Sequence, residues 1–428
     1  MQPTTRRRFL AGAASTPLIT LSTGARAAEL DRRLDAYLAP YVASKDFAGV
    51  VLIKRGARVL ARRAYGDAAM AGGANNRLNS KFGIESVSKL ITSACLYSLR
   101  TRGMLSFDDR LSRFLPDFPR ADDINLTMLM QHRSGLARDL SNFETARQTP
   151  RTLEQLTPLV AREGFVTEPG QNSGYSNNGY RVLGRVIEIA SGESYHEAAA
   201  RLVLRPHGMR NTGPLFGPHV RGLSHACTVG ADPRSLRTPL PLDLSNWQGA
   251  ASFYSTADDL ARFMDNYPPR ALETPPGPRD KFGHDGFGHG YMAMAYRYPE
   301  SDTIIIVTGN IESGLFQPLQ SDLEAIAFGE TTSAPSPPLE VPGAAGELTR
   351  FAGRYGLGPG RSMEMAVVDG RLAANAGDGF TALWPIAPNR FFSRLRYATL
   401  TFVESDGAIA RVDWSEGGGT FPCPRLPD

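Results

Sequence analysis

The sequence predicts an α+β protein: an antiparallel sheet flanked by helices, followed by a small C-terminal antiparallel β-barrel or sandwich domain. Two strand pairs are expected, at 49–65 and at 291–307, each formed by apolar runs around a turn signal. The chain between them has helical periodicity, as at 181–190. Strands at both ends with helices between them indicate one sheet that is assembled from distant sequence and covered by helices.

A change of composition separates the two domains. Residues 329–346 are rich in Pro, Ser and Ala and have hardly any apolar periodicity, which predicts a linker. Beyond it, short alternating strands are joined by tight-turn signals such as Asp369-Gly370. We therefore expect a main domain over 28–328 and a small β domain over 347–428.

The first 27 residues predict a twin-arginine-type export signal. Arg6 to Arg8 precede a mildly apolar stretch, and Ala25 to Ala27 provide the small residues of a signal peptidase site. Without this segment the 47 basic side chains fall to 43, which equals the 43 acidic ones. A neutral chain without a basic run gives no reason to expect nucleic acid as a partner. We expect a periplasmic or secreted protein.

Composition also limits membrane, disulfide and metal chemistry. No apolar run approaches the roughly 18 residues of a spanning helix, so no membrane span is expected. Cys95, Cys227 and Cys423 are too few for a disulfide framework, although Cys227 and Cys423 could pair in an oxidising compartment. Neither the cysteines nor the histidines have metal-ligand spacing, so we expect no metal and no other cofactor. The sequence carries no signal for the oligomeric state.

Ser86 and Lys89 are the first candidate catalytic residues. They stand at the start of an apolar helical segment, one turn apart, so their side chains share a face. A serine hydroxyl is a poor nucleophile until a base takes its proton, and a lysine can be that base because burial lowers its pKa. The helix N-terminus also favours negative charge near Ser86. Ser-x-x-Lys alone is a weak signal.

Two later segments carry further candidates. Tyr175 and Asn177 are expected on a short loop that precedes an amphipathic helix. Next to an ammonium group, a phenol can take the proton of Ser86 and later pass one to the leaving group. His284 and Gly286 are expected just before a strand, where Gly286 would leave room for a substrate backbone at the strand edge. Each segment alone also fits a purely structural role.

In the order Ser-x-x-Lys, Tyr-x-Asn and His-x-Gly, these motifs resemble the class C β-lactamase and penicillin-binding serine hydrolase family. The resemblance covers about residues 35–328 and implies a β-lactamase/transpeptidase-like fold. It extends beyond the motifs to segments 82–89, 102–119, 129–136 and 254–260, with Arg133 in place of the usual threonine.

The resemblance also implies roles for the candidate residues. Ser86 would be acylated, and Lys89 and Tyr175 would share the proton transfers, with the identity of the base left open. Asn177 would hydrogen-bond Lys89 and the substrate amide. The backbone N–H groups of Ser86 and Phe287 would form the oxyanion hole, each donor being worth about 3 kcal/mol.

His284 is the main departure from the family's pattern. β-Lactamases usually carry a lysine there that holds a substrate carboxylate, and a neutral histidine holds an anion less well. Relatives with His-x-Gly are often esterases, D-aminopeptidases or other amide hydrolases. The resemblance therefore implies an exported serine hydrolase of a small-molecule or peptide substrate: an ester, a small amide or a D-amino-acid-containing peptide. The alternatives are a β-lactamase, a D-alanyl-D-alanine carboxypeptidase, or a penicillin-binding or cell-wall-peptide sensor module that deacylates slowly.

Overall fold

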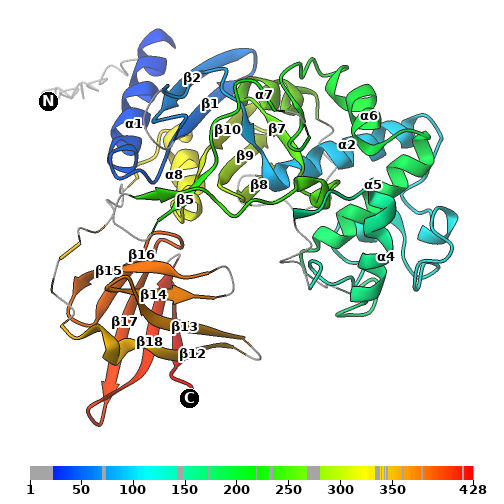
Figure 1. Ribbon diagram of the computed structural model, residues 1–428. Helices are drawn as coiled ribbons and strands as arrows, with labels where there is room; N and C mark the ends of the chain where they lie inside the picture. The colour runs from blue at the N-terminus through cyan, green and yellow to red at the C-terminus, as the bar shows by residue number, and fades with distance from the viewer. Residues whose placement is uncertain are drawn as a thin grey trace, which may run out of the picture.

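A five-stranded antiparallel sheet forms the centre of the main domain (Figure 1). The computed structural model describes residues 23–427, apart from 70–73, 142–147, 172–173, 218, 231–234, 268–279, 333–337, 339, 342, 344–345, 359–360, 377–378 and 417–418. The strands of the sheet are β1 (Gly49–Arg55), β2 (Arg58–Tyr65), β8 (Phe282–Gly288), β9 (Tyr291–Tyr298) and β10 (Thr303–Gly309). Their order, β2-β1-β10-β9-β8, joins the two predicted hairpins and leaves β8 at one edge.

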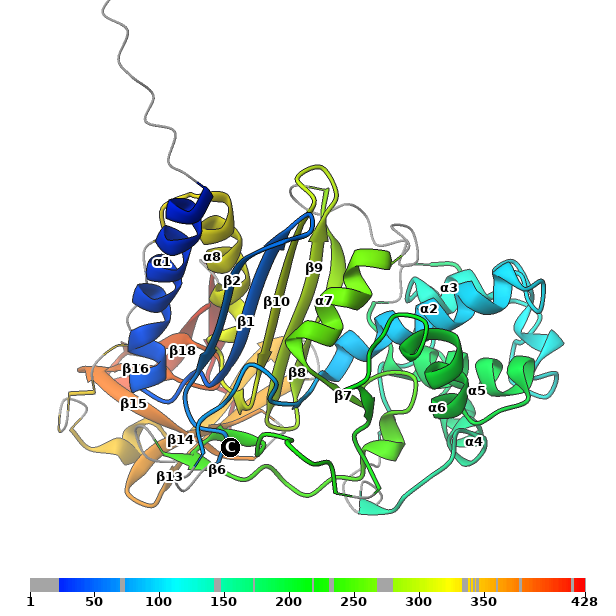
Figure 2. The ribbon, with the colours of Figure 1, turned by 90° about the horizontal axis from the view of Figure 1, so that it is seen from above.

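Helices cover both faces of this sheet, as predicted (Figure 2). The alternation of side chains in β1 shows why: Val51 and Ile53 pack against α1 and α8, whereas Val50 and Leu52 face the helical core on the other side. The helices are α1 (Thr23–Ala43), α2 (Ser88–Thr101), α3 (Leu126–Met130), α4 (Leu153–Glu163), α5 (Asn177–Ser191), α6 (Tyr195–Ala199), α7 (Ala257–Asn266) and α8 (Phe316–Phe328).

The main domain also contains several short strands and the helical turn that carries Ser86. The 3-10 turn η1 (Glu85–Val87) follows β3 directly and leads into α2. The small strands are β3 (Phe82–Gly83), β4 (Gly213–Pro214), β5 (Cys227–Val229), β6 (Leu236–Arg237), β7 (Phe253–Ser255) and β11 (Ile311–Glu312). Because α2 is apolar nearly all round, it is buried along most of its length.

The C-terminal region is a nearly closed antiparallel barrel of eight strands in sequence order. The strands are β12 (Gly353–Gly358), β13 (Arg361–Val368), β14 (Arg371–Asn375), β15 (Thr381–Ala387), β16 (Arg390–Ser393), β17 (Ala398–Ser405), β18 (Ala408–Glu416) and β19 (Gly419–Pro424). A bridge between Tyr355 and Arg425 brings the first strand beside the end of the last. In β13, Met363 and Met365 fill the interior of the barrel, whereas Val367, near the end of the strand, is exposed.

A buried ion pair fastens the barrel to the main domain. Arg394 Nε donates to Asp46 Oδ1 at 2.7 Å, and both side chains are at most 1% exposed. The same carboxylate accepts hydrogen bonds from Tyr397 and Ser44. Gly314 lies so close to the barrel that a Cβ there would be 2.3 Å from the Tyr397 nitrogen. The contact therefore has little room for a sliding movement of the two domains.

Three further predictions from the sequence concern a disulfide, membrane spans and the export signal. Cys95, Cys227 and Cys423 are free and buried, so the suggested Cys227–Cys423 disulfide is not formed. In the described part of the chain, no helix has both the length and the apolar composition needed to cross a membrane. Residues 1–22 of the predicted export signal, and much of the predicted linker, lie outside the described residues.

The Arg394–Asp46 pair gives a prediction about stability. Arg394→Ala leaves a fully buried carboxylate without its cation, so the free energy of unfolding should fall by about 3–5 kcal/mol. Arg411→Ala, which removes an exposed partner of Asp413, should change it by less than about 1 kcal/mol. Urea denaturation followed by fluorescence measures both values, and equal losses would contradict a special role of the buried pair.

Candidate active site

Ser86 lies in the sharp η1 turn between β3 and α2. The turn is anchored by a hydrogen bond from the Ile84 N–H to the Phe253 carbonyl at 3.0 Å. Glu85, just before the serine, has a φ of +46°, a conformation that is uncommon for a residue other than glycine. The N-terminus of α2 follows immediately, so its partial positive charge lies near the serine, as expected.

The structure brings Ser86 together with Lys89, Tyr175 and Asn177. Lys89 Nζ is 3.0 Å from Ser86 Oγ and 2.8 Å from Asn177 Oδ1, and it also donates to the Ala250 carbonyl at 3.0 Å. The Tyr175 hydroxyl donates to Ser86 Oγ at 2.7 Å. A nucleophilic oxygen is therefore in direct contact with an amine and with a phenol, which is the arrangement that acyl transfer requires.

Burial shifts the pKa values of the Lys89 amine and the Tyr175 phenol in opposite directions. Desolvation lowers the pKa of Lys89 well below its usual value, because its side chain is fully buried. Burial also raises the pKa of Tyr175, so the phenol keeps its proton. A neutral amine has two hydrogens, which suit Asn177 and Ala250, and one lone pair that can accept the Ser86 proton. These directions favour Lys89 as the base and Tyr175 as the proton donor.

The loop before α5 places Tyr175, whereas Asn177, which was expected on the same loop, is the first residue of the helix. Ser176, between them, is the N-cap of α5 and accepts a hydrogen bond from the Gly179 N–H. The Ser176 N–H donates to His132 Nδ1 at 3.0 Å, and the His132 ring packs against Tyr175 at 4.5 Å between ring centroids. Burial lowers the pKa of His132 to about 3, so this neutral ring supports the phenol without competing for its proton.

His284 lies within strand β8, and not before a strand as the sequence suggested. The segment is rich in glycine, which obscures the strand pattern, while the turn itself falls at His289 and Gly290 with φ values of +50° and +84°. The His284 ring is 6.0 Å from the Tyr175 ring. Burial lowers the pKa of His284 to about 4, so this histidine is neutral.

Gly286 is needed for the approach of β8 to the nucleophile. A Cβ at this position would lie 2.6 Å from the Ile84 carbonyl oxygen and 2.7 Å from the Ser86 nitrogen. The glycine thus makes room for the backbone of η1, and it also lines the cavity at the edge of the sheet, where the sequence suggested space for a substrate backbone. This packing holds β8, which carries the proposed oxyanion donor Phe287, against the N–H of Ser86.

A carboxylate–histidine pair beside the nucleophile was missed by the sequence reasoning. Glu85 Oε2 is 2.8 Å from His289 Nδ1, although the two residues are 204 positions apart. The His289 ring packs edge-on against Trp247 at 4.7 Å. The pair joins the η1 turn to the β8–β9 turn, and a charged residue directly before the predicted nucleophile is the one signal that could have pointed to it.

A cavity of about 320 Å³ opens at these residues. Its walls include Ser86, Tyr175, His284, Trp247 and His289. The part of the chain that the structure describes contains no group of His, Cys, Asp or Glu side chains suited to a metal ion. The cavity can accept a small acyl donor beside the serine.

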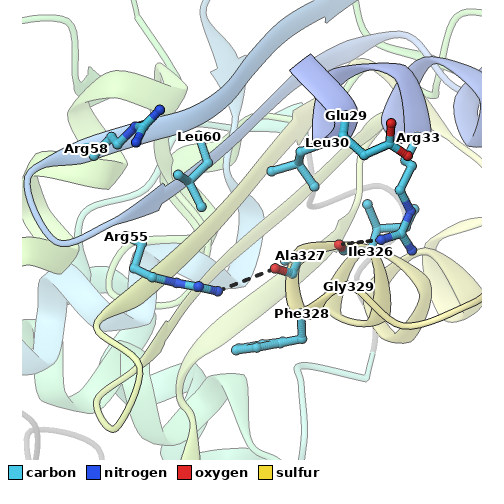
Figure 3. A pocket seen from close by; sticks show the side chains of 10 residues that line it. All are labelled: Glu29, Leu30, Arg33, Arg55, Arg58, Leu60, Ile326, Ala327, Phe328 and Gly329. Atoms are coloured by element: carbon cyan, nitrogen blue, oxygen red, sulfur yellow. Dashed lines mark hydrogen bonds between the residues drawn. The ribbon is translucent and has the colours of Figure 1, made fainter. Parts of the chain in front are cut away.

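A larger cavity, of about 480 Å³, lies away from the serine between α1, the β1–β2 turn and α8 (Figure 3). Arg33 and Arg55 point into it and donate to the carbonyls of Ile326 and Ala327 at 3.4 and 3.5 Å. These carbonyls belong to the last turn of α8, whose free acceptors need such donors. The two arginines therefore satisfy carbonyl groups at the C-terminus of α8. The candidate catalytic residues line the smaller cavity.

A helix-covered antiparallel sheet in which a serine contacts a buried lysine and a tyrosine defines a class of serine hydrolases. The chain belongs to the beta-lactamase family, whose model matches residues 34–315. The protein is accordingly a hydrolase of this family, with the catalytic motifs in the family's order along the chain.

Relatives and solved structures agree with this assignment. The chain is 25% identical to penicillin-binding protein 4* of Bacillus subtilis (strain 168), over 89% of this chain and 95% of the relative. It is 26% identical to the teichoic acid D-alanine hydrolase of Staphylococcus aureus, over 52% of this chain and 55% of the relative.

Two solved structures share the fold. SurE superposes with a TM-score of 0.62 at 20% identity, over 93% of this chain and 99% of SurE. The D-amino acid amidase of Ochrobactrum anthropi superposes with a TM-score of 0.62 at 19% identity, over 71% of this chain and 99% of the amidase. The first match therefore includes the barrel as well as the main domain.

The protonation states predict a pH profile. If Lys89 must be neutral to act, kcat/KM for a D-alanyl p-nitroanilide should rise with pH through a pKa well below the ordinary lysine value of about 10.4. The raised pKa of Tyr175 should add no falling limb below about pH 10. Lys89→Arg, which cannot release its proton, should lose about 10²- to 10⁴-fold at every pH. A profile that falls between pH 7 and 9 would contradict Lys89 as base.

Gly286 provides a second test of the site. Gly286→Ala should lower kcat by on the order of 10²-fold, because the added methyl forces β8 away from the Ser86 backbone. Gly356→Ala in the barrel, where a Cβ meets nothing closer than 3.5 Å, should leave kcat unchanged. Steady-state kinetics and thermal unfolding of both variants separate this effect from misfolding, and unchanged kcat in Gly286→Ala would refute the close approach.

Proposed function

We propose that the protein is an exported serine hydrolase that forms an acyl-enzyme on Ser86 and cleaves an ester or small amide of a D-amino acid. The observation that supports it most is the double contact of Ser86 Oγ, with the Lys89 amine at 3.0 Å and the Tyr175 hydroxyl at 2.7 Å. Export is proposed from the order of arginines, apolar stretch and cleavage site at the N-terminus.

Acylation follows from these contacts. Lys89 Nζ takes the proton of Ser86 as Oγ attacks the substrate carbonyl carbon, and the backbone N–H groups of Ser86 and Phe287 stabilise the negative oxygen. When the tetrahedral intermediate collapses, Tyr175 gives its proton to the leaving oxygen or nitrogen. The Lys89 ammonium, 4.7 Å from the centre of the Tyr175 ring, then returns a proton to the phenolate. The products are the acyl-enzyme and the protonated leaving group.

Deacylation uses the same groups in reverse roles. A water molecule attacks the acyl carbon while its proton passes to the tyrosine and lysine pair, and Ser86 Oγ leaves with a proton from Tyr175. The acid is released and the free enzyme returns to its starting protonation state. No cofactor is needed to balance either step.

The substrate class is supported by charge and by the relatives. Neutral His284 is a poor holder of the carboxylate that β-lactams carry, which argues for weak β-lactam turnover. One relative is named a D-alanine hydrolase and one fold neighbour a D-amino acid amidase. A D-aminoacyl group is therefore the acyl donor that we propose.

A substrate panel tests the proposal. D- and L-aminoacyl p-nitroanilides, p-nitrophenyl esters and nitrocefin are compared with wild type and Ser86→Ala. We expect D-aminoacyl turnover that Ser86→Ala abolishes, with nitrocefin turned over at least about 10²-fold less efficiently. Intact mass after fluorescent penicillin distinguishes a slow sensor: a persistent adduct without D-aminoacyl turnover would overturn the hydrolase proposal.

A further inference from the structure

Arg138 is a cation in the catalytic cavity that the mechanism above does not use. It lies on the chain between α3 and α4, is exposed, and its guanidinium carbon is 5.4 Å from the centre of the Tyr175 ring. In the described part of the structure no acidic side chain forms an ion pair with it. The neighbouring Asp139 is instead committed to Arg181 and Asn177, at 2.8 and 2.7 Å.

The direction of strand β8 shows which part of a substrate Arg138 would meet. His284, near the start of the strand, lies beside the Tyr175 ring, whereas Phe287 lies near the end of the strand and His289, just beyond it, packs against Trp247. The acyl carbonyl belongs beside the oxyanion donors of η1 and Phe287. The leaving group belongs beside the phenol that protonates it, and that is the ring on which Arg138 lies.

The other basic groups on this side carry no charge. Burial lowers the pKa of His284 to about 4 and that of Lys89 well below its usual value, so both are neutral when the enzyme works. The carboxylate of the nearby Asp285 hydrogen-bonds Tyr296 and its own backbone, and not the Arg138 guanidinium. Arg138 therefore supplies the fixed positive charge on the leaving-group side.

We propose that Arg138 binds an anionic leaving group, a carboxylate or a phosphate, and so determines the preference of the site among acyl donors. This inference rests on the proposed function and deepens it. A guanidinium presents paired N–H donors that match the oxygens of either anion, and among the described residues this one has no acidic partner to give up first. An exposed arginine on an aromatic ring is also held in place at little entropic cost.

Matched substrates that differ only in leaving-group charge test this. Acetyl-D-alanyl-D-alanine is compared with its C-terminal amide, and the D-alanyl ester of glycerol phosphate with that of glycerol. Arg138→Gln should lower the anionic-to-neutral ratio of kcat/KM by about 10- to 100-fold, through KM, and Arg138→Lys should restore part of it. Arg133→Gln, on the same loop but bonded to the Gly170 carbonyl, is the matched control and should leave the ratio unchanged.

The two substrate pairs distinguish the source of the anion. A ratio that falls only for the peptide pair identifies a carboxylate, and one that falls only for the ester pair identifies a phosphate; either supports the inference. Equal losses for charged and neutral partners would show a structural role and overturn it, as would unchanged ratios.

A binding measurement keeps this test separate from the proposed function. In Ser86→Ala, the Kd of acetyl-D-alanyl-D-alanine should rise about 10-fold or more when Arg138→Gln is added, while the Kd of the amide stays constant. This result is expected even if wild type proves unable to turn over D-aminoacyl substrates, in which case only the proposed function fails. A Kd that does not respond to Arg138→Gln would refute the anion site whatever the activity.

Discussion

The site depends on the burial of one amine. Lys89 is enclosed by α2, α5 and the segment around Ala250, and the atoms that it contacts are a hydroxyl, an amide oxygen and a backbone carbonyl, none of them charged. An ammonium without a contacting carboxylate is expensive to bury, so the fold itself favours the neutral amine. The apolar surface of α2 thus does more than fill the core, because it creates the base that Ser86 needs.

The same site constrains parts of the chain that are far from the serine. The Phe287 ring packs against Phe316 at 5.1 Å, and the Gly290 N–H donates to Glu312 at 3.0 Å. The segment that carries these two partners is fixed in turn by the barrel, since the Gly314 N–H donates to the Arg394 carbonyl at 2.8 Å. The barrel therefore helps to set the position of the oxyanion strand, although none of its described residues lines the cavity.

Sequence patterns predicted the fold class and identified the main site residues. They did not predict the long-range contacts that hold some of these residues in place. Period and turn signals are local, so both hairpins and the α2 helix were predictable. The Glu85–His289 pair and the Arg394–Asp46 pair join positions 204 and 348 residues apart, and no local pattern contains such a contact. Strand β8 was not predicted, because its glycines serve close backbone packing, which removes the side chains that mark a strand.

The charge arrangement explains how a shared mechanism can serve a different substrate. Acyl transfer needs only the serine, amine and phenol, so changes elsewhere in the cavity leave the chemistry intact. In this chain the position that carries a lysine in β-lactamases holds a neutral histidine, while a guanidinium stands over the phenol. A neutral residue on β8 and a cation beside the Tyr175 ring change where the site can hold an anion of the substrate, and this is a selection among substrates, not among reactions.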